Sequence, residues 1–105
     1  MDDSLKAKVN SIAAAIKADM NPSSILLFGS VAKGTDTSES DLDICLLFDR
    51  LPYRKLEILR KARRIARPIY QGSLDFIAYS QEEWLEYLTA NASFEVQVQR
   101  NSITL

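Results

Sequence analysis

The stretch LFGSVAKGTDTSESDLDICLLF, residues 27–48, joins two apolar runs through a loop of small and hydroxylated residues. Strands are depleted in aspartate, yet Asp41 and Asp43 stand where the second apolar run begins. Alternate side chains of a strand point to one face of its sheet, so both carboxylates would share a face, roughly 6 to 7 Å apart along the strand. Two acids placed in this way indicate either a solvated turn that their side chains cap or a functional site to which the carboxylates contribute.

The pattern on both sides of this stretch predicts a small mixed β-sheet covered by helices, of the α/β (α+β) class. Apolar periodicity and turn residues predict a helix over 3–20, a strand over 25–28, a helical turn within 29–34, a loop over 35–40, a strand over 41–48, a helix over 53–67, a strand over 73–80 and a helix over 81–90. The tail after residue 90 favours a continued helix to about residue 99 and then a short extended piece.

The helices should each bury one apolar stripe against the sheet. For residues 53–67 we predict a stripe of Leu56, Leu59, Ala62 and Ala66, and for residues 81–90 a stripe of Trp84, Leu85 and Leu88. Ser80 is placed to cap the second of these helices.

Composition limits the chemistry that the chain can support. A length of 105 residues predicts one domain, residues 1–105. The chain has no histidine and a single cysteine, Cys45, which excludes Ser-His-Asp and Cys-His catalysis, histidine-ligated zinc and an internal disulfide. We expect a cytoplasmic protein without a membrane segment, whose acid-base or metal chemistry depends on carboxylates.

A third acid, Asp75, lies in the predicted strand 73–80, offset by one position from the apolar set Leu74, Phe76 and Ala78. If the two acid-bearing strands are neighbours, Asp41, Asp43 and Asp75 come together on one sheet face. Like charges at that distance repel, and a hard cation such as Mg²⁺ removes the conflict. Three acids on one face suit phosphoryl or nucleotidyl transfer with two metal ions, although Asp-x-Asp alone is also common where a loop meets a strand.

The loop supplies groups that suit a phosphate. Gly29 allows a close backbone approach, Ser30 offers a hydroxyl donor, and Lys33 could either reach a phosphate or remain solvated. Gly34 fits the end of a helical turn. The spacing matches neither a P-loop nor a dinucleotide-binding fingerprint.

In combination these segments resemble the signature of the DNA polymerase β-like nucleotidyltransferase superfamily. The residues that carry the resemblance are Gly29-Ser30-Val31-Ala32-Lys33-Gly34, then Ser40-Asp41-Leu42-Asp43-Ile44, and Asp75 on a later strand. The length and layout resemble the minimal nucleotidyltransferases, in particular the MntA-like antitoxins that are paired with HEPN-domain toxins. Lys33 stands where many minimal members have arginine, which keeps the charge and loses the bidentate fork.

The resemblance implies a nucleotidyltransferase fold and a role for each matched residue. Asp41, Asp43 and Asp75 would bind Mg²⁺, with two ions expected, and Asp75 would also act as general base on the acceptor hydroxyl. Gly29 and Ser30 would hold the triphosphate, with Lys33 and Ser40 as further nucleotide-binding residues. It further implies ATP as the donor and a tyrosine hydroxyl of a HEPN toxin as the acceptor, so that the chain is an adenylyltransferase that silences an RNase.

Two other functions stay open. The chain could be an antitoxin that neutralises its partner by occlusion, with a vestigial site, or an enzyme that modifies a small hydroxyl compound without a partner. The many basic residues of the segment 53–67 favour a solvated helix face over a docking surface for an acidic partner or nucleic acid. We do not expect a nucleic acid partner, and self-association into a homo-oligomer stays open. The basic residues in question are Arg54, Lys55, Arg60, Lys61, Arg63, Arg64 and Arg67.

Overall fold

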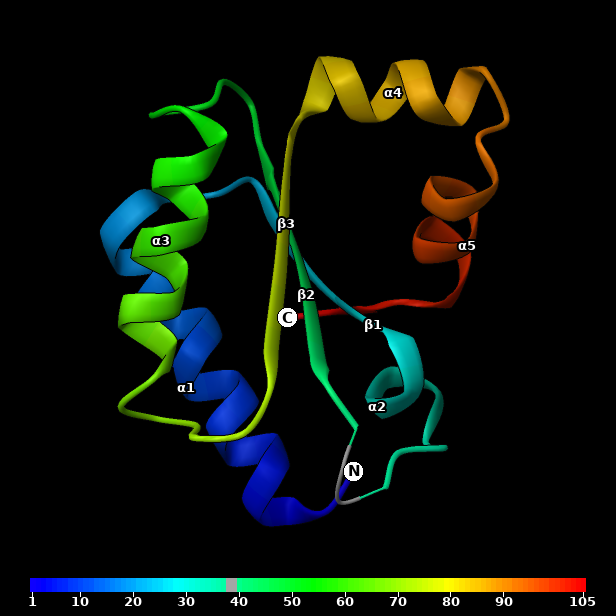
Figure 1. The fold of residues 1–105 in the computed structure, drawn as a ribbon. Helices are drawn as coiled ribbons and strands as arrows, with labels where there is room; N and C mark the ends of the chain where they lie inside the picture. The colour runs from blue at the N-terminus through cyan, green and yellow to red at the C-terminus, as the bar shows by residue number, and fades with distance from the viewer. Residues whose placement is uncertain (38–39) are drawn as a thin grey trace.

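The elements of the chain follow the predicted order closely in a computed structural model, which describes residues 1–37 and 40–105 (Figure 1). They are α1 (Asp3–Met20), β1 (Ser24–Phe28), α2 (Gly29–Lys33), β2 (Leu42–Phe48), α3 (Lys55–Ala66), β3 (Leu74–Ser80), α4 (Gln81–Thr89), α5 (Ser93–Asn101) and β4 (Ile103–Thr104). Within these residues, no helix combines the length and the apolar character that a membrane span requires.

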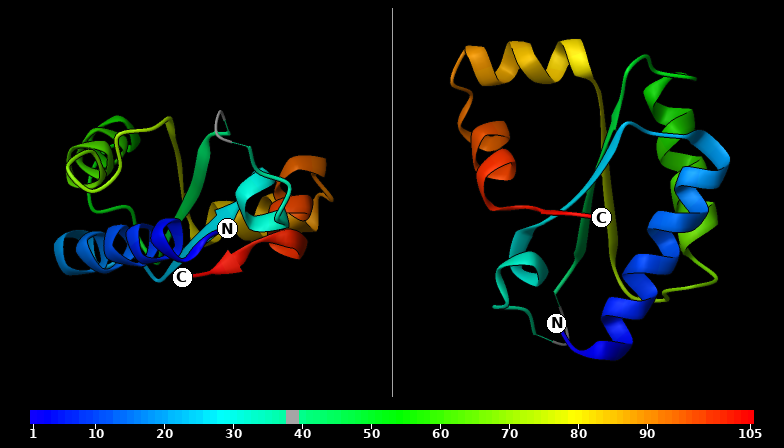
Figure 2. Two further views of the ribbon diagram at one scale, coloured as in Figure 1. Left: turned by 90° about the horizontal axis from the view of Figure 1, so that it is seen from below. Right: turned by 180° about the vertical axis from the view of Figure 1, so that it is seen from behind.

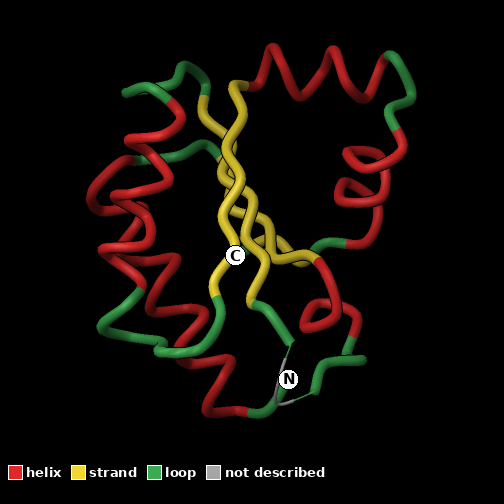
Figure 3. Tube along the Cα trace, in the orientation of Figure 1, coloured by secondary structure: helices red, strands yellow, loops and turns green. Residues whose placement is uncertain are grey.

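The strands form one mixed, twisted sheet in the order β3-β2-β1-β4, which confirms the predicted fold class (Figure 3). β2 and β3 are parallel, whereas β1 runs antiparallel to both β2 and β4. A parallel pair needs a crossover connection, and α3 supplies it between β2 and β3. The two acid-bearing strands are therefore neighbours, as the predicted site requires.

Helices cover both faces of the sheet (Figure 2). On one face α1 and α3 pack over alternate residues of the strands, including Ile44, Leu46 and Phe76, in the main core. On the other face α4 and α5 bury the intervening residues, among them Cys45, with Trp84 and Val98 from the helices. β2 is thus buried on both sides along most of its length, and the buried Cys45 is a packing residue.

Local capping explains where two helices begin. Asp2 accepts a hydrogen bond from the Leu5 amide at 2.7 Å and caps α1. Ser80 caps α4 as predicted, since its hydroxyl accepts from the Glu83 amide while the Glu83 carboxylate accepts from the Ser80 amide. This reciprocal pair is a capping box, which satisfies two otherwise unpaired N–H groups.

Two predicted stripes are partly wrong. Leu56 and Leu85 are each 59% exposed, although both were expected to face the sheet. α3 instead buries Ile58, Ala62 and Ala66, which recur every four residues. Leu56 lies two positions from Ile58 and so falls on the far side of the helix, because successive residues are about 100° apart.

The boundaries of two predicted segments also differ from the structure. β2 begins at Leu42, so Asp41 precedes the strand. The tail is no continuation of α4, because the chain turns at Asn91, whose φ of 56° is left-handed. A separate helix, α5, follows, and β4 then adds to the sheet beside β1.

Candidate functional site

Asp43 and Asp75 lie directly opposite each other on neighbouring strands. In the parallel ladder of β2 and β3, Asp43 pairs with Asp75. Residues paired in register point to the same face and stand about 4.8 Å apart across the ladder. Their face is the one that α4 and α5 cover further along, but Asp75 itself is exposed and Asp43 is half-buried. The prediction that these two acids share a sheet face is confirmed.

Gly29 and Asp43 are in close contact. Phe28, the last residue of β1, pairs with Asp43, and Gly29 follows it with a φ of 80°. A Cβ added to Gly29 would overlap Oδ2 of Asp43. Both the left-handed backbone and the close approach therefore require glycine at this position.

This position perturbs the carboxyl of Asp43. Desolvation by burial, together with the charges of Asp75 and Asp41, raises the pKa of Asp43 from 3.8 to about 6. Asp41 is exposed just before β2, yet its charge is close enough to act on Asp43. We refer to Asp41, Asp43 and Asp75 as the acidic site.

Asp43 and Asp75 supply two carboxylates to which a divalent cation could bind together with the phosphates of a substrate. Among the described residues, no group of three or more acidic or thiol side chains is gathered closely enough to hold a metal ion by itself. Mg²⁺ is commonly bound through one or two carboxylates with substrate phosphates, rather than by a cage made only of protein groups. Two carboxylates in register, with a third charge nearby, match that kind of donor set.

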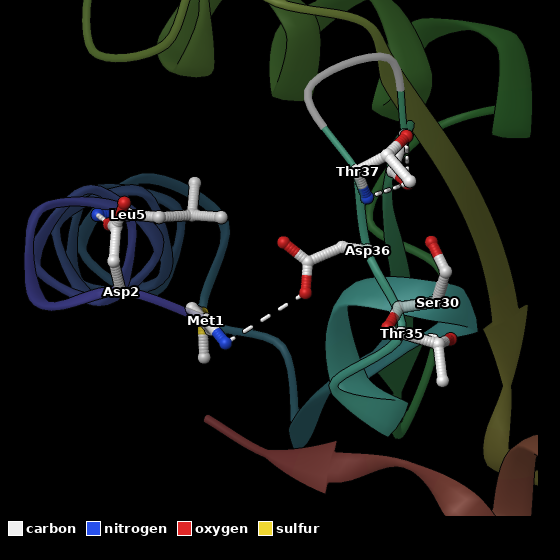
Figure 4. Close-up of polar contacts among 8 residues, drawn as sticks. Met1, Asp2, Leu5, Ser30, Thr35, Asp36 and Thr37 are labelled. Atoms are coloured by element: carbon white, nitrogen blue, oxygen red, sulfur yellow. Dashed lines mark hydrogen bonds and ion pairs between the residues drawn. The ribbon is translucent and has the colours of Figure 1, made fainter.

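Helix α2 places the glycine-serine corner beside the acidic site. Figure 1 shows α2 and the starting ends of β2 and β3 at the same end of the molecule. Ser30 is the second residue of α2, and its carbonyl accepts from the Thr35 amide at 3.0 Å. Figure 4 shows its hydroxyl pointing away from Thr35. Gly34, with a φ of 76°, ends α2 as the sequence predicts.

Short contacts hold the beginning of the following loop. The Ser40 hydroxyl accepts a hydrogen bond from the Thr37 amide at 2.8 Å. Asp36 pairs with the N-terminal amino group at 3.8 Å (Figure 4). Ser40 therefore has a structural contact in the loop in addition to its predicted role in nucleotide binding.

A pocket of about 270 Å³ opens next to this corner, between α2 and α5. Its lining includes Gly29 and the exposed Lys33 from α2, and three residues of α5 that the sequence analysis did not single out: Phe94, Gln97 and Asn101. No local pattern marks these residues, because their place depends on the turn at Asn91.

Comparisons with known proteins concern the family and the fold of the chain. The family model described as "Polymerase beta, Nucleotidyltransferase" matches residues 10–102. A solved structure designated a minimal nucleotidyltransferase shares 21% identity and superposes with a TM-score of 0.70, over 100% of this chain and 97% of that one. A second, designated a nucleotidyltransferase from Sulfolobus solfataricus, shares 14% identity with a TM-score of 0.54, over 99% of this chain and 86% of that one. No curated protein matches the chain significantly.

Proposed function

The chain belongs to the polymerase beta nucleotidyltransferase family, and we propose that it transfers AMP from ATP to a hydroxyl of a partner protein. The acceptor in this proposal is a tyrosine of a HEPN-type toxin, so that the chain acts as an antitoxin. The observation that supports an enzymatic function is the pairing of Asp43 with Asp75 in the parallel ladder, next to the turn at Gly29. A purely occluding antitoxin would not need this arrangement.

In the proposed reaction the acceptor oxygen attacks the α-phosphorus of ATP. A bond forms between that oxygen and phosphorus, the bond from the α-phosphorus to the bridging oxygen breaks, and pyrophosphate leaves. The hydroxyl proton passes to Asp75, which is the better placed of the paired acids because it is exposed to an incoming acceptor. Gly29 and the Ser30 hydroxyl orient the β- and γ-phosphates.

Asp41, Asp43 and Asp75 would hold Mg²⁺ together with the triphosphate. When bound, the metal would stabilise the charge that develops on the attacking and leaving oxygens. Asp43 contributes a carboxylate kept against the Gly29 backbone, and its raised pKa means that protons compete for it below about pH 6. Protons and Mg²⁺ compete for this carboxylate, and we therefore propose that the apparent affinity for Mg²⁺ falls as the pH is lowered through that value.

The test is transfer of radiolabel to the protein encoded by the neighbouring gene, which this proposal takes to be the toxin. The purified full chain is incubated with Mg²⁺, the toxin and ATP labelled at either the α- or the γ-phosphate. Nucleotidyl transfer labels the toxin only from α-labelled ATP, whereas phosphoryl transfer labels it only from γ-labelled ATP. We expect Asp43→Asn and Asp75→Asn to reduce α-label transfer at least about 100-fold, in line with the loss of a general base or metal ligand.

Asp49→Asn serves as the matched control, because Asp49 is an exposed acid that follows β2 outside the acidic site. It should leave the transfer unchanged. The toxin could instead be neutralised without becoming labelled, and equally well by the Asp43→Asn and Asp75→Asn variants. That result would refute the enzymatic function and support an antitoxin that acts by occlusion. Transfer of label to a small hydroxyl compound in the absence of any toxin would refute the proposal that the acceptor is a partner protein.

A further inference from the structure

We propose that the pocket between α2 and α5 binds the adenine base of the nucleotide, with Phe94 stacking on the base and with Gln97 and Asn101 recognising its edge. This inference rests on the proposed transfer from ATP and assigns residues that the family signature does not contain. It also assigns a use to α5, which no part of the proposed chemistry employs.

The position of the pocket follows from the sheet. Phe28 and Asp43 are paired across β1 and β2, so their side chains share one face, and both Phe28 and Gly29 line the pocket. The pocket therefore starts where the carboxylate of Asp43 meets Gly29. A nucleotide whose phosphates lie at the acidic site can extend its ribose and base along α2 into this space. Its volume of about 270 Å³ is just below the range for drug-sized ligands, which suits a single nucleoside.

Phe94 has a ring surface that the fold does not use. The residue is 48% exposed, and its ring contacts Phe28 edge to face, with centroids 5.7 Å apart and planes at 85°. An edge-to-face contact leaves much of the Phe94 ring open. An exposed aromatic ring beside a nucleotide site can serve as a platform on which a base stacks.

The two amides offer a paired donor and acceptor. Asn101 donates from Nδ2 to Oε1 of Gln97 at 2.8 Å. That bond leaves the Gln97 amino group as a donor and the Asn101 carbonyl oxygen as an acceptor, and within the described residues neither has another hydrogen bond. Adenine presents the complement, a ring-nitrogen acceptor beside an amino donor, whereas guanine presents two acceptors on its Hoogsteen edge. On the Hoogsteen edge, the pair therefore complements adenine and not guanine.

The remaining wall is cationic. Lys33 is exposed and lines the same pocket, where its ammonium can meet a phosphate or a ribose hydroxyl. The pocket thus combines two aromatic side chains, Phe28 and Phe94, with the apolar Val98, two amides and a cation. Ligand pockets commonly combine a mainly apolar lining with a few polar groups that fix orientation.

The experiment measures binding of the Mg²⁺ complexes of α,β-methylene-ATP, α,β-methylene-GTP and tripolyphosphate to the full chain by calorimetry. We expect the ATP analogue to bind more tightly than the GTP analogue and than tripolyphosphate. Phe94→Ala and Phe94→Leu should raise the Kd of the ATP analogue roughly tenfold or more and leave that of tripolyphosphate unchanged. The Leu variant retains an apolar contact with Phe28 and so guards against a loss of folding.

Two further variants complete the design. The double change Gln97→Leu with Asn101→Leu should abolish the preference for the ATP analogue over the GTP analogue. Tyr53→Ala is the matched control, since Tyr53 is 42% exposed and is not in the pocket. Its binding should equal that of the wild type.

The inference is overturned if the Phe94 variants bind the ATP analogue as the wild type does, or if tripolyphosphate binds as tightly as the ATP analogue. Either result leaves the proposed function standing as long as α-label still reaches the toxin. If the Phe94 variants bind tripolyphosphate and the ATP analogue more weakly by the same factor, the substitution acts on the phosphates. That result would also overturn the proposed binding of the base. Absence of any nucleotide binding by the wild-type chain would refute the proposed function and this inference together.

Discussion

The substitution Asp43→Asn should stabilise the protein near neutral pH while it removes a proposed catalytic group. Burial, with the charges of Asp75 and Asp41, raises the pKa of Asp43 from 3.8 to about 6 in the folded chain. A carboxyl group whose pKa rises on folding destabilises the folded state at every pH at which the group is ionised in the unfolded chain. Asparagine keeps the size of the side chain and removes this charge.

The size of the gain follows from the pKa. A displacement of about two pH units in a pKa corresponds to about 3 kcal/mol of differential interaction. Asp43 is only half-buried, so water screens much of this interaction and a smaller part appears in the free energy of unfolding. We expect a gain of about 1 kcal/mol above pH 6, which raises the Tm of a chain of this size by roughly 5 °C.

The pH dependence has a definite sign. Below about pH 4, Asp43 is protonated in both the folded and the unfolded chain, and the variant should gain nothing. Between about pH 4 and pH 6 the folded chain binds the proton more tightly than the unfolded chain does. The wild type therefore loses stability relative to the variant as the pH rises through this window, and the difference is complete above it.

Thermal unfolding followed by circular dichroism, without divalent cations, tests this expectation at about pH 4 and about pH 7.5. Asp49→Asn is the control, because it removes the same formal charge at an exposed position outside the acidic site. The reasoning is refuted if Asp43→Asn has no higher Tm than the wild type at the higher pH. An increase of equal size at both pH values, or one matched by Asp49→Asn, would refute it as well.

Three further substitutions test the contacts around the site and the core. Gly29→Ala should lower the free energy of unfolding by at least about 2 kcal/mol and abolish transfer, because its Cβ would overlap Asp43 in a left-handed backbone. Gly34→Ala, where no atom lies within 4 Å of the added Cβ, should lower the free energy of unfolding by only about 1 kcal/mol and retain transfer. Urea unfolding and the label assay compare the two variants. Equal losses of stability and transfer in both would contradict the contact between Gly29 and Asp43. Tyr79→Phe should cost about 1 to 3 kcal/mol, because it removes the 2.8 Å hydrogen bond from Tyr79 to the buried carboxylate of Glu95. A urea midpoint equal to that of the wild type would show that Glu95 finds another donor.

Local patterns were enough to predict the elements that carry the acidic site. The stretch 27–48 contains a strand, a turn bracketed by glycines and a second strand, and all three are found there. The conformation of Gly34 and the cap at Ser80 were also predicted. Such features depend on residues within a few positions of one another, so the chemistry of the side chains decides them with little help from the rest of the fold.

The faces of the outer helices could not be predicted in the same way. Leu56 and Leu85 are apolar and periodic with their neighbours, yet both are exposed. A helix that is apolar over more than one stripe can rotate, and the facing surface selects the side that packs. For α3 that surface is the one against which Ile58, Ala62 and Ala66 fit.

By itself, the sequence determined the class of the fold, the order of its elements and the identity of the acids, because periodicity and turn chemistry are local properties. Only the tertiary structure decided that Asp43 and Asp75 stand side by side, that Gly29 lies against the carboxylate, and that α5 closes a pocket beside them. These facts depend on the register of a parallel ladder joined through α3 and on a turn at Asn91. Register and turns of this kind are selected by packing between segments distant in the chain, which no short stretch of residues contains.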